Sequence, residues 1–258
     1  MRPFFSVAMI LGASSQKGKP AWFFMNANKF GGRQLKKIVR ECLKEANFEK
    51  GLAIINDLPP RQAVNPLFSA FCSLDDTVKW RAVAAMGSVV ANLAEIDLES
   101  ARVVMRRFIW NLNDESGGIG WGCPEAMGEI MALNTTLADE YWCLLTAYIQ
   151  PDGNYLEHPV LQRGVVWAVG RLAHARPRLI CSSAHFLFPY MTAEDANLRG
   201  LAAWAVAPFE DPRAKPFLER ISGDHSVFEL FKEGQLVKEK VSRMAKQALK
   251  SITSQLRH

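Results

Sequence analysis

Four segments of this chain repeat one short pattern at nearly constant spacing, and this repeat constrains the fold more than any other feature. The segments begin at Trp80, Trp121, Arg163 and Arg199, so that consecutive starts lie 41, 42 and 36 residues apart. Each segment is rich in Ala, Val and Gly at helical spacing, and a further helix-length segment precedes it. A period of about 40 residues is typical of a two-helix unit, and such units stack because none can bury its apolar face alone.

The rest of the sequence agrees with stacked helices. From residue 33 onward the apolar residues recur at helical spacing, and no segment shows the sustained alternation expected of a half-buried strand. Clusters of Pro, Gly, Asn and Asp interrupt this pattern. We therefore predict an all-α fold, a right-handed α-solenoid of about five HEAT-like helical pairs over residues 33–258. The charged stretch 212–252 is expected to end the stack as C-terminal capping helices.

One repeat carries a family resemblance. Residues 75–87 read DDTVKWRAVAAMG, and this string resembles the second helix of HEAT repeats of the phycobilisome-lyase type. The resemblance covers roughly residues 61–210 and implies a HEAT-like fold; the activity attached to the family name is bilin attachment to acceptor proteins, which no residue here supports specifically. Residues 110–122, WNLNDESGGIGWG, look like a string in uncharacterised HEAT-repeat proteins of sulfate-reducing bacteria, which supplies no activity.

The N-terminal segment and the cysteines bear on localisation. Residues 1–32 are predicted to be a poorly ordered leader, although Arg2 and the apolar run 4–13 also fit a short signal peptide. The five cysteines are odd in number and form no CxxC pair, so neither a disulfide framework nor a zinc site is indicated. Unpaired thiols favour the cytoplasm over export. No stretch is long and apolar enough to span a membrane.

The net charge of +5 is unevenly distributed along the chain. Residues 61–210 hold 11 Lys and Arg against 16 Asp and Glu, whereas the segments before and after hold 10 against 4 and 10 against 6. A protein that tracks nucleic acid needs a continuous basic surface. The acidic body therefore disfavours a nucleic-acid partner and favours a protein or peptide.

A glycine-rich string before the helix that Pro124 opens is the most unusual local feature. Its glycines, which indicate unusual torsions or a close approach, are Gly117, Gly118, Gly120 and Gly122. The string lacks the Lys-Ser/Thr of a P-loop and no strand precedes it, so nucleotide binding is not indicated. Cys123 could have a lowered pKa at a helix start, but without a His nearby in sequence we favour a packed cysteine. The histidines lack metal-ligand spacing, so neither a metal nor a cofactor is predicted.

The repeat also predicts which side chains meet on the concave face. Trp121, Glu125 and Glu129 lie one helical turn apart and share a face, and the repeat offset places three more residues beside them. The predicted binding residues of this concave row are Trp80, Trp121, Glu125, Arg163, Trp167, Arg171 and Arg199. These side chains either satisfy one another through cation–π and ion pairs, which is the favoured interpretation, or form an open pocket for a peptide or a flat anionic ligand.

Three functions follow in order of preference. The solenoid form and the absence of a catalytic motif favour a non-enzymatic protein-interaction scaffold that binds a peptide or protein on its concave face. The alternative is a nucleic-acid-acting HEAT protein, similar in architecture to the alkylpurine DNA glycosylases, with Trp121, Arg163, Trp167 and Asp114 as concave residues. A lyase or maturation chaperone for a cofactor-bearing protein rests on fold analogy alone.

Overall fold

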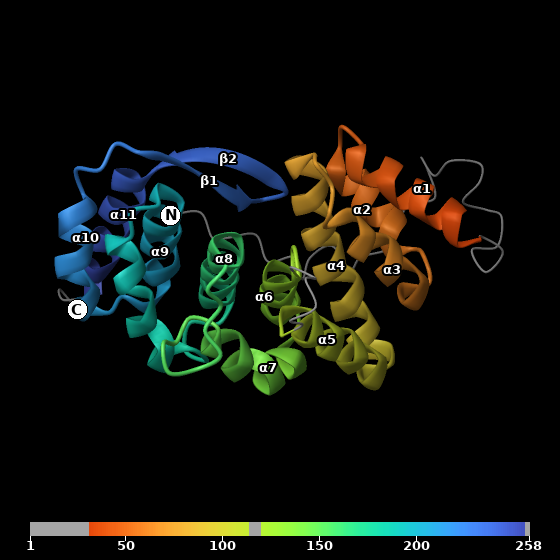
Figure 1. The fold of residues 1–258 in the computed structure, drawn as a ribbon, viewed down its shortest axis with the longest axis horizontal. Coiled ribbons are helices and arrows are strands. Elements are labelled where there is room, and N and C mark those ends of the chain that lie inside the picture. Colours follow the sequence, from red (N-terminus) through yellow and green to blue (C-terminus); the bar gives the residue numbers. More distant parts are fainter. Residues whose placement is uncertain (1–30, 114–119, 256–258) are drawn as a thin grey trace.

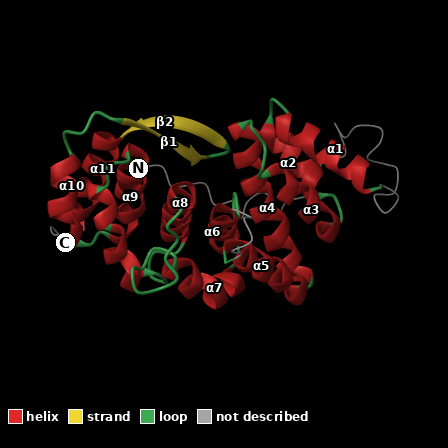
Figure 2. Ribbon diagram, in the orientation of Figure 1, coloured by secondary structure: helices red, strands yellow, loops and turns green. Residues whose placement is uncertain are grey.

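The computed structural model describes residues 31–113 and 120–255, which form a stack of helices and one β-hairpin (Figures 1 and 2). The first half of the chain contains α1 (Gly32–Lys44), α2 (Phe48–Asn56), α3 (Pro60–Ala70), α4 (Asp76–Ile96), α5 (Leu98–Leu112) and α6 (Cys123–Leu133). The second half contains α7 (Thr135–Ala147), α8 (Pro159–Ala175), α9 (Ala196–Val206), α10 (Lys215–Ile221), β1 (Val227–Lys232), β2 (Gln235–Lys240) and α11 (Val241–Gln255).

The helices form two rows, as a solenoid requires. Helices α4, α6, α8, α9 and α11 pack against one another in that order, with α2 beside α4, and they make up the inner row. The outer row contains α3, α5 and α7, followed by two 3-10 segments, Cys181–Leu187 and Pro189–Thr192, that stand in for the outer helix before α9. The four repeated segments lie in α4, α8 and α9 and at the start of α6, so the predicted α-solenoid is confirmed.

Two of the inner helices, α4 and α9, begin at aspartate caps. Asp75 accepts a hydrogen bond from Thr77 N (2.9 Å) at the start of α4, and Asp195 accepts one from Asn197 N (3.0 Å) at the start of α9. Such a cap satisfies a main-chain donor that the first helical turn leaves without a partner, and it stabilises the helix by about 1 kcal/mol. At these two helices, the turn residue therefore sets where the helix begins.

Glycines allow the inner helices to approach closely, as their position in the repeat predicts. A Cβ atom placed on Gly128 of α6 would lie 2.6 Å from the Cα atom of Ala168 on α8. One on Gly87 of α4 would lie 2.3 Å from Cγ of Glu129 on α6. Larger side chains at these positions would push neighbouring repeats apart, because protein interiors have no spare volume to receive them.

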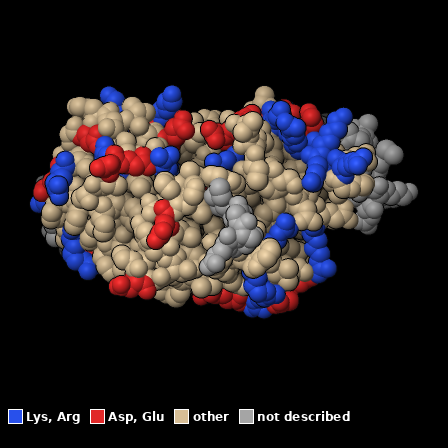
Figure 3. Space-filling view, in the orientation of Figure 1, with Lys and Arg blue, Asp and Glu red and all other residues tan. Residues whose placement is uncertain are grey.

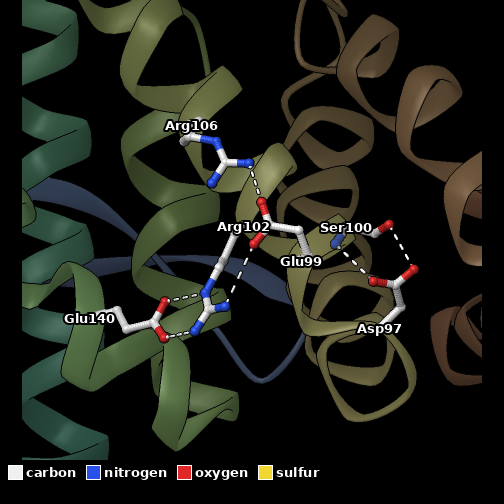
Figure 4. A network of polar contacts seen from close by, with 6 residues as sticks. All are labelled: Asp97, Glu99, Ser100, Arg102, Arg106 and Glu140. Carbon is white, nitrogen blue, oxygen red and sulfur yellow. Dashed lines mark hydrogen bonds and ion pairs between the residues drawn. The ribbon is translucent and has the colours of Figure 1, made fainter.

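The outer row is linked by ion pairs on its surface. Figure 4 shows Arg102 of α5 donating to both carboxylate oxygens of Glu140 on α7, with an Nε–Oε2 distance of 2.9 Å. Within α5, Arg106 donates to Glu99 at 2.6 Å. Ion pairs of this exposure contribute only about 0–1 kcal/mol each. Apolar packing between the rows therefore provides most of the stability.

The predicted capping region contains a β-hairpin that the sequence analysis did not predict. Residues 212–252 were expected to be helical, and α10 and α11 are, but β1 and β2 pair as antiparallel strands with Val227 opposite Lys240 and Lys232 opposite Gln235. The two-residue loop has positive φ at Glu233 (52°) and Gly234 (75°), which a tight hairpin turn requires. The strand β1 is short, and its alternation of buried and exposed residues is interrupted because Leu230 and Phe231 are adjacent and both buried. It therefore lacks the sustained alternation that predicts a strand from sequence.

The ends of the chain are described only in part. The first helix begins at Gly32, so the predicted leader, residues 1–32, lies almost wholly outside the described residues. Among the helices that the structure describes, none combines the length and apolarity needed to cross a bilayer.

Candidate binding site on the concave face

The concave row contains a cluster of three aromatic rings, Trp80, Trp167 and Phe231, which we call the concave cluster. The rings of Trp80 on α4 and Trp167 on α8 lie 4.9 Å apart, and Phe231 of β1 stacks on Trp80 at 5.1 Å with a 14° angle between ring planes. Trp167 is 2% exposed and Phe231 is 5% exposed. The hairpin therefore covers the aromatic part of the concave face, and at Trp167 the side chains contact one another, as the favoured interpretation expects, instead of forming an open pocket.

Two inner helices hold the main chain of β1 with their side chains. The indole Nε1–H of Trp167 donates to the carbonyl oxygen of Phe231 at 3.1 Å, and the amide N–H of Glu229 donates to Oδ1 of Asn197 on α9 at 3.4 Å. These main-chain groups belong to alternate residues, so one edge of β1 pairs with β2 and the other faces α8 and α9. The inner row thus binds an extended segment by its backbone.

The hairpin crosses the inner row from one end of the stack toward the other (Figure 1). At its base, Arg199 of α9 donates to Asp224 (2.8 Å) and to Ser226 Oγ (3.4 Å), the residues that lead into β1. At its tip, a Cβ atom on Gly234 would lie 3.2 Å from the Phe48 ring of α2. Figure 1 shows both strands lying above α6 and α8, with α5 and α7 on the opposite side.

The predicted arginines have carboxylate partners. Arg171 donates to Glu129 through Nε (2.6 Å) and Nη2 (3.2 Å), which confirms the predicted pairing of Arg with Glu between neighbouring repeats. Arg163 donates to Asp195 at 2.6 Å, and although burial of Asp195 opposes its ionisation, hydrogen bonds from Arg163 and Asn197 hold its pKa below the usual range. These arginines are therefore used to join consecutive repeats.

The predicted stacking of Arg on Trp121 is not found. The described contact of the Trp121 ring is an edge-to-face arrangement with His158, with centroids 5.6 Å apart. Within the described residues, arginines stack on Phe48 and Phe68 instead, from Arg81 and Arg107. Trp121 is partly exposed and lies in the turn before α6. The concave row predicted from the repeat is thus divided, because α6 begins only at Cys123 and leaves Trp121 in the preceding turn, while the hairpin covers Trp80 and Trp167.

Glu125 is buried rather than exposed in a groove. Its side chain packs against Gly164 of α8, where a Cβ atom would lie 2.7 Å from the carboxyl group, and Oε2 has no hydrogen-bond partner. Desolvation by burial raises the pKa of this carboxyl group. A buried carboxyl group in such surroundings is favoured in its neutral form. Glu125 is therefore a packing residue between α6 and α8 and is not available to a partner.

We expect Glu125→Gln to remove a pH-dependent part of the stability. Because the folded-state pKa is raised, the contribution of the neutral carboxyl is complete below the ordinary value of 4.5 and is lost as the pH rises toward the folded-state pKa. The wild type should thus lose stability relative to Glu125→Gln as the pH rises above about 4.5. Urea unfolding of both proteins at a series of pH values on either side of 4.5 measures this difference in the free energy of unfolding. The control is Glu157→Gln, which changes an exposed glutamate. A constant difference would contradict the prediction.

The glycine-rich string and Cys123 have structural roles in the described residues. Gly120 and Gly122 have φ values of 58° and 72°, and a Cβ atom on Gly122 would lie 2.8 Å from Cγ of Phe71, so unusual torsion and close approach are both confirmed. Gly117, Gly118 and Asp114 lie outside the described residues. Burial raises the pKa of the Cys123 thiol, which makes it a packed cysteine. The described residues contain no group of His, Cys, Asp and Glu that could hold a metal ion.

Sequence reasoning missed the residues that complete the concave cluster. Phe231 and Asn197 lie outside the aligned tryptophans and arginines, and Phe231 reaches Trp80 only because a hairpin folds back over the inner row. The one local signal is Gly234, since glycine readily adopts the positive φ that a two-residue hairpin turn requires. Nothing in the sequence indicates the surface on which the hairpin packs.

Comparison with known proteins gives structural neighbours alone. No protein-family model matches the chain, and no curated protein matches it in sequence. A designed armadillo repeat protein in complex with the peptide (KR)4 is 18% identical, with 85% of this chain and 99% of that chain covered and a TM-score of 0.49. An engineered protein is 15% identical, with 85% and 96% covered and a TM-score of 0.49. Computationally designed armadillo repeat proteins for modular peptide recognition are 16% identical, with 84% and 99% covered and a TM-score of 0.46.

Proposed function

We propose that this protein is a non-enzymatic protein-interaction scaffold that binds an extended segment of a partner protein on its concave face, at the place β1 occupies. The observation that carries the proposal is the way β1 is held. Trp167 and Asn197 contact its main chain at 3.1 and 3.4 Å, and main-chain contacts of this kind accept many sequences. A face built this way can bind a strand from another chain as well as its own.

The aromatic rings add side-chain selectivity to this backbone recognition. Phe231 stacks on Trp80, and its ring centroid lies 6.2 Å from that of Trp167, so the concave cluster accepts one planar side chain against a pair of indoles that contact each other. Buried aromatic contacts commonly dominate the affinity of an interface. The expected partner segment is therefore an extended strand or hairpin with an aromatic residue at the position of Phe231, and it competes with β1 for the inner row.

A peptide added in trans tests this proposal. The probe is a fluorescein-labelled peptide with the sequence of residues 226–241, and the receptor is the full chain carrying Phe231→Ala, which empties the aromatic contact. We expect the variant to bind the peptide at least about tenfold more tightly than the wild type, because its own β1 competes less well. Fluorescence anisotropy measures the affinity, and circular dichroism checks that the variant remains helical.

Two controls make the result specific. Val227→Ala changes an exposed residue of the same strand and should leave the affinity at the wild-type value. The same peptide carrying Phe231→Ala should bind the variant weakly, because it lacks the ring that contacts Trp80. If a folded Phe231→Ala protein binds neither peptide, the hairpin is an inseparable part of the core and concave-face binding is overturned.

A further inference from the structure

A second surface, away from the hairpin, has the shape and charge of a binding site. A cleft of about 1060 Å³ lies between α1, α3, α5 and the start of α6, and we call it the basic cleft. Its polar lining residues include Lys36, Arg61, Asn65, Arg107 and Asn111. Its apolar lining includes Phe68 and Trp121, which are partly exposed, and the buried residues Leu35 and Phe71. The cleft therefore combines cations at its walls with an apolar base.

Among the described residues that line this cleft, basic side chains outnumber acidic ones. None of the described residues that line it is Asp or Glu. Arg61 forms an ion pair with Asp97, but the guanidinium of Arg107 donates to the neutral amide of Asn65 at 2.6 Å and stacks on Phe68 at 3.9 Å. No ion pair of Lys36 is found among the described residues. The neutral partners fix the position of Arg107 and leave its charge for a ligand.

The surroundings strengthen the positive potential at this end of the molecule. Helix α1 carries exposed basic residues along its length, and Figure 3 shows Lys and Arg gathered over this region. The exposed cations of the helix are Arg33, Lys36, Lys37, Arg40 and Lys44. A hollow with one sign of charge and low-dielectric walls attracts ligands of opposite charge.

We propose that the basic cleft binds a short acidic segment of a polypeptide, with carboxylates at Lys36 and Arg107 and an apolar side chain against the partly exposed ring of Trp121. The amides of Asn65 and Asn111 can satisfy a peptide main chain. A long nucleic acid fits less well, because the neighbouring outer surface carries Asp97, Glu99 and Glu140, and because the Phe68 ring already stacks on Arg107. Residues 1–30 contain four basic and no acidic residues, so their charge does not suit this cleft.

Binding of a defined acidic peptide tests the assignment. The probe is a fluorescein-labelled peptide of alternating Glu and Leu, titrated with the full wild-type chain at low and moderate salt. We expect saturable binding that weakens with salt and falls by about tenfold in Arg107→Gln and in Lys36→Gln, because each variant removes one charge-assisted contact. The matched control is Arg106→Gln, the neighbouring arginine of α5, which pairs with Glu99 and does not line the cleft.

Each other outcome overturns the proposal. Absence of saturable binding, or an equal loss in Arg106→Gln, excludes the cleft as a peptide site. An oligothymidylate of the same net charge that binds more tightly and depends on Arg107 assigns the cleft to nucleic acid instead. These binding results do not depend on the concave face, because the described residues that line the basic cleft include none from the hairpin. The proposal for the cleft and the proposal for the concave face can therefore succeed or fail separately.

Discussion

Replacing Phe231 by Ala lowers the free energy of unfolding by about 3–5 kcal/mol, the range for loss of a buried aromatic side chain. The ring is 5% exposed and touches both indoles of the concave cluster, so its removal leaves a cavity between α4, α8 and β1. These three elements are far apart in sequence and meet at this ring. The loss should therefore detach the hairpin from the inner row as well as lower the overall stability.

Urea unfolding followed by circular dichroism measures this loss, and tryptophan fluorescence reports the exposure of Trp80 and Trp167. Val227→Ala, on the same strand but 53% exposed, should change the unfolding free energy by less than about 0.5 kcal/mol. A loss below about 1 kcal/mol for Phe231→Ala would contradict the view that the hairpin is anchored at this ring. It would also mean that β1 leaves the concave face at little cost.

Replacing Gly128 by Val lowers the free energy of unfolding by about 3 kcal/mol, at the upper end of the usual range for overpacking. The atoms in the way are main-chain atoms of α8, because a Cβ atom on Gly128 would lie 2.6 Å from the Ala168 Cα and 2.7 Å from its carbonyl oxygen. A flexible side chain could move aside, but a helix backbone cannot do so without shifting the whole repeat. Helices α6 and α8 pack against each other in the middle of the inner row, so a shift of α8 would weaken the packing of the neighbouring helices as well.

Helix propensity acts in the opposite direction and provides a sharper test. A Gly to Ala change inside an exposed helix would add about 1 kcal/mol of stability. We expect Gly128→Ala to destabilise the protein in spite of this gain, because its single methyl group already meets Ala168. Gly223→Val is the control, since a Cβ atom there has no neighbour within 4 Å. Thermal and urea unfolding measure the stability of all three variants. A Gly128→Ala protein that is more stable than the wild type would show that α8 can shift away from α6 at little cost in free energy.

The repeat in the sequence was sufficient to predict the architecture, since periodic small residues and acidic turns are local features with local causes. Asp75 and Asp195 cap the helices they precede, and Gly87 and Gly128 lie where helices touch. The ion pair of Arg171 with Glu129 followed from the same offset, because neighbouring repeats place equivalent positions side by side. These predictions required only the period and the geometry of a helix.

The tertiary structure decided which of the predicted site residues can meet a partner. Burial of Trp167 and Glu125 depends on segments that are distant in sequence, the hairpin at Phe231 in one case and Gly164 of α8 in the other. The basic cleft likewise gathers Lys36, Arg61 and Arg107 from α1, α3 and α5, none of which contains one of the four aligned segments. Periodicity determines which face a side chain occupies on its own helix, whereas exposure depends on what other part of the chain packs against that face. Thus the sequence alone determined a stack of helical pairs, and only the folded chain determined which surfaces remain open.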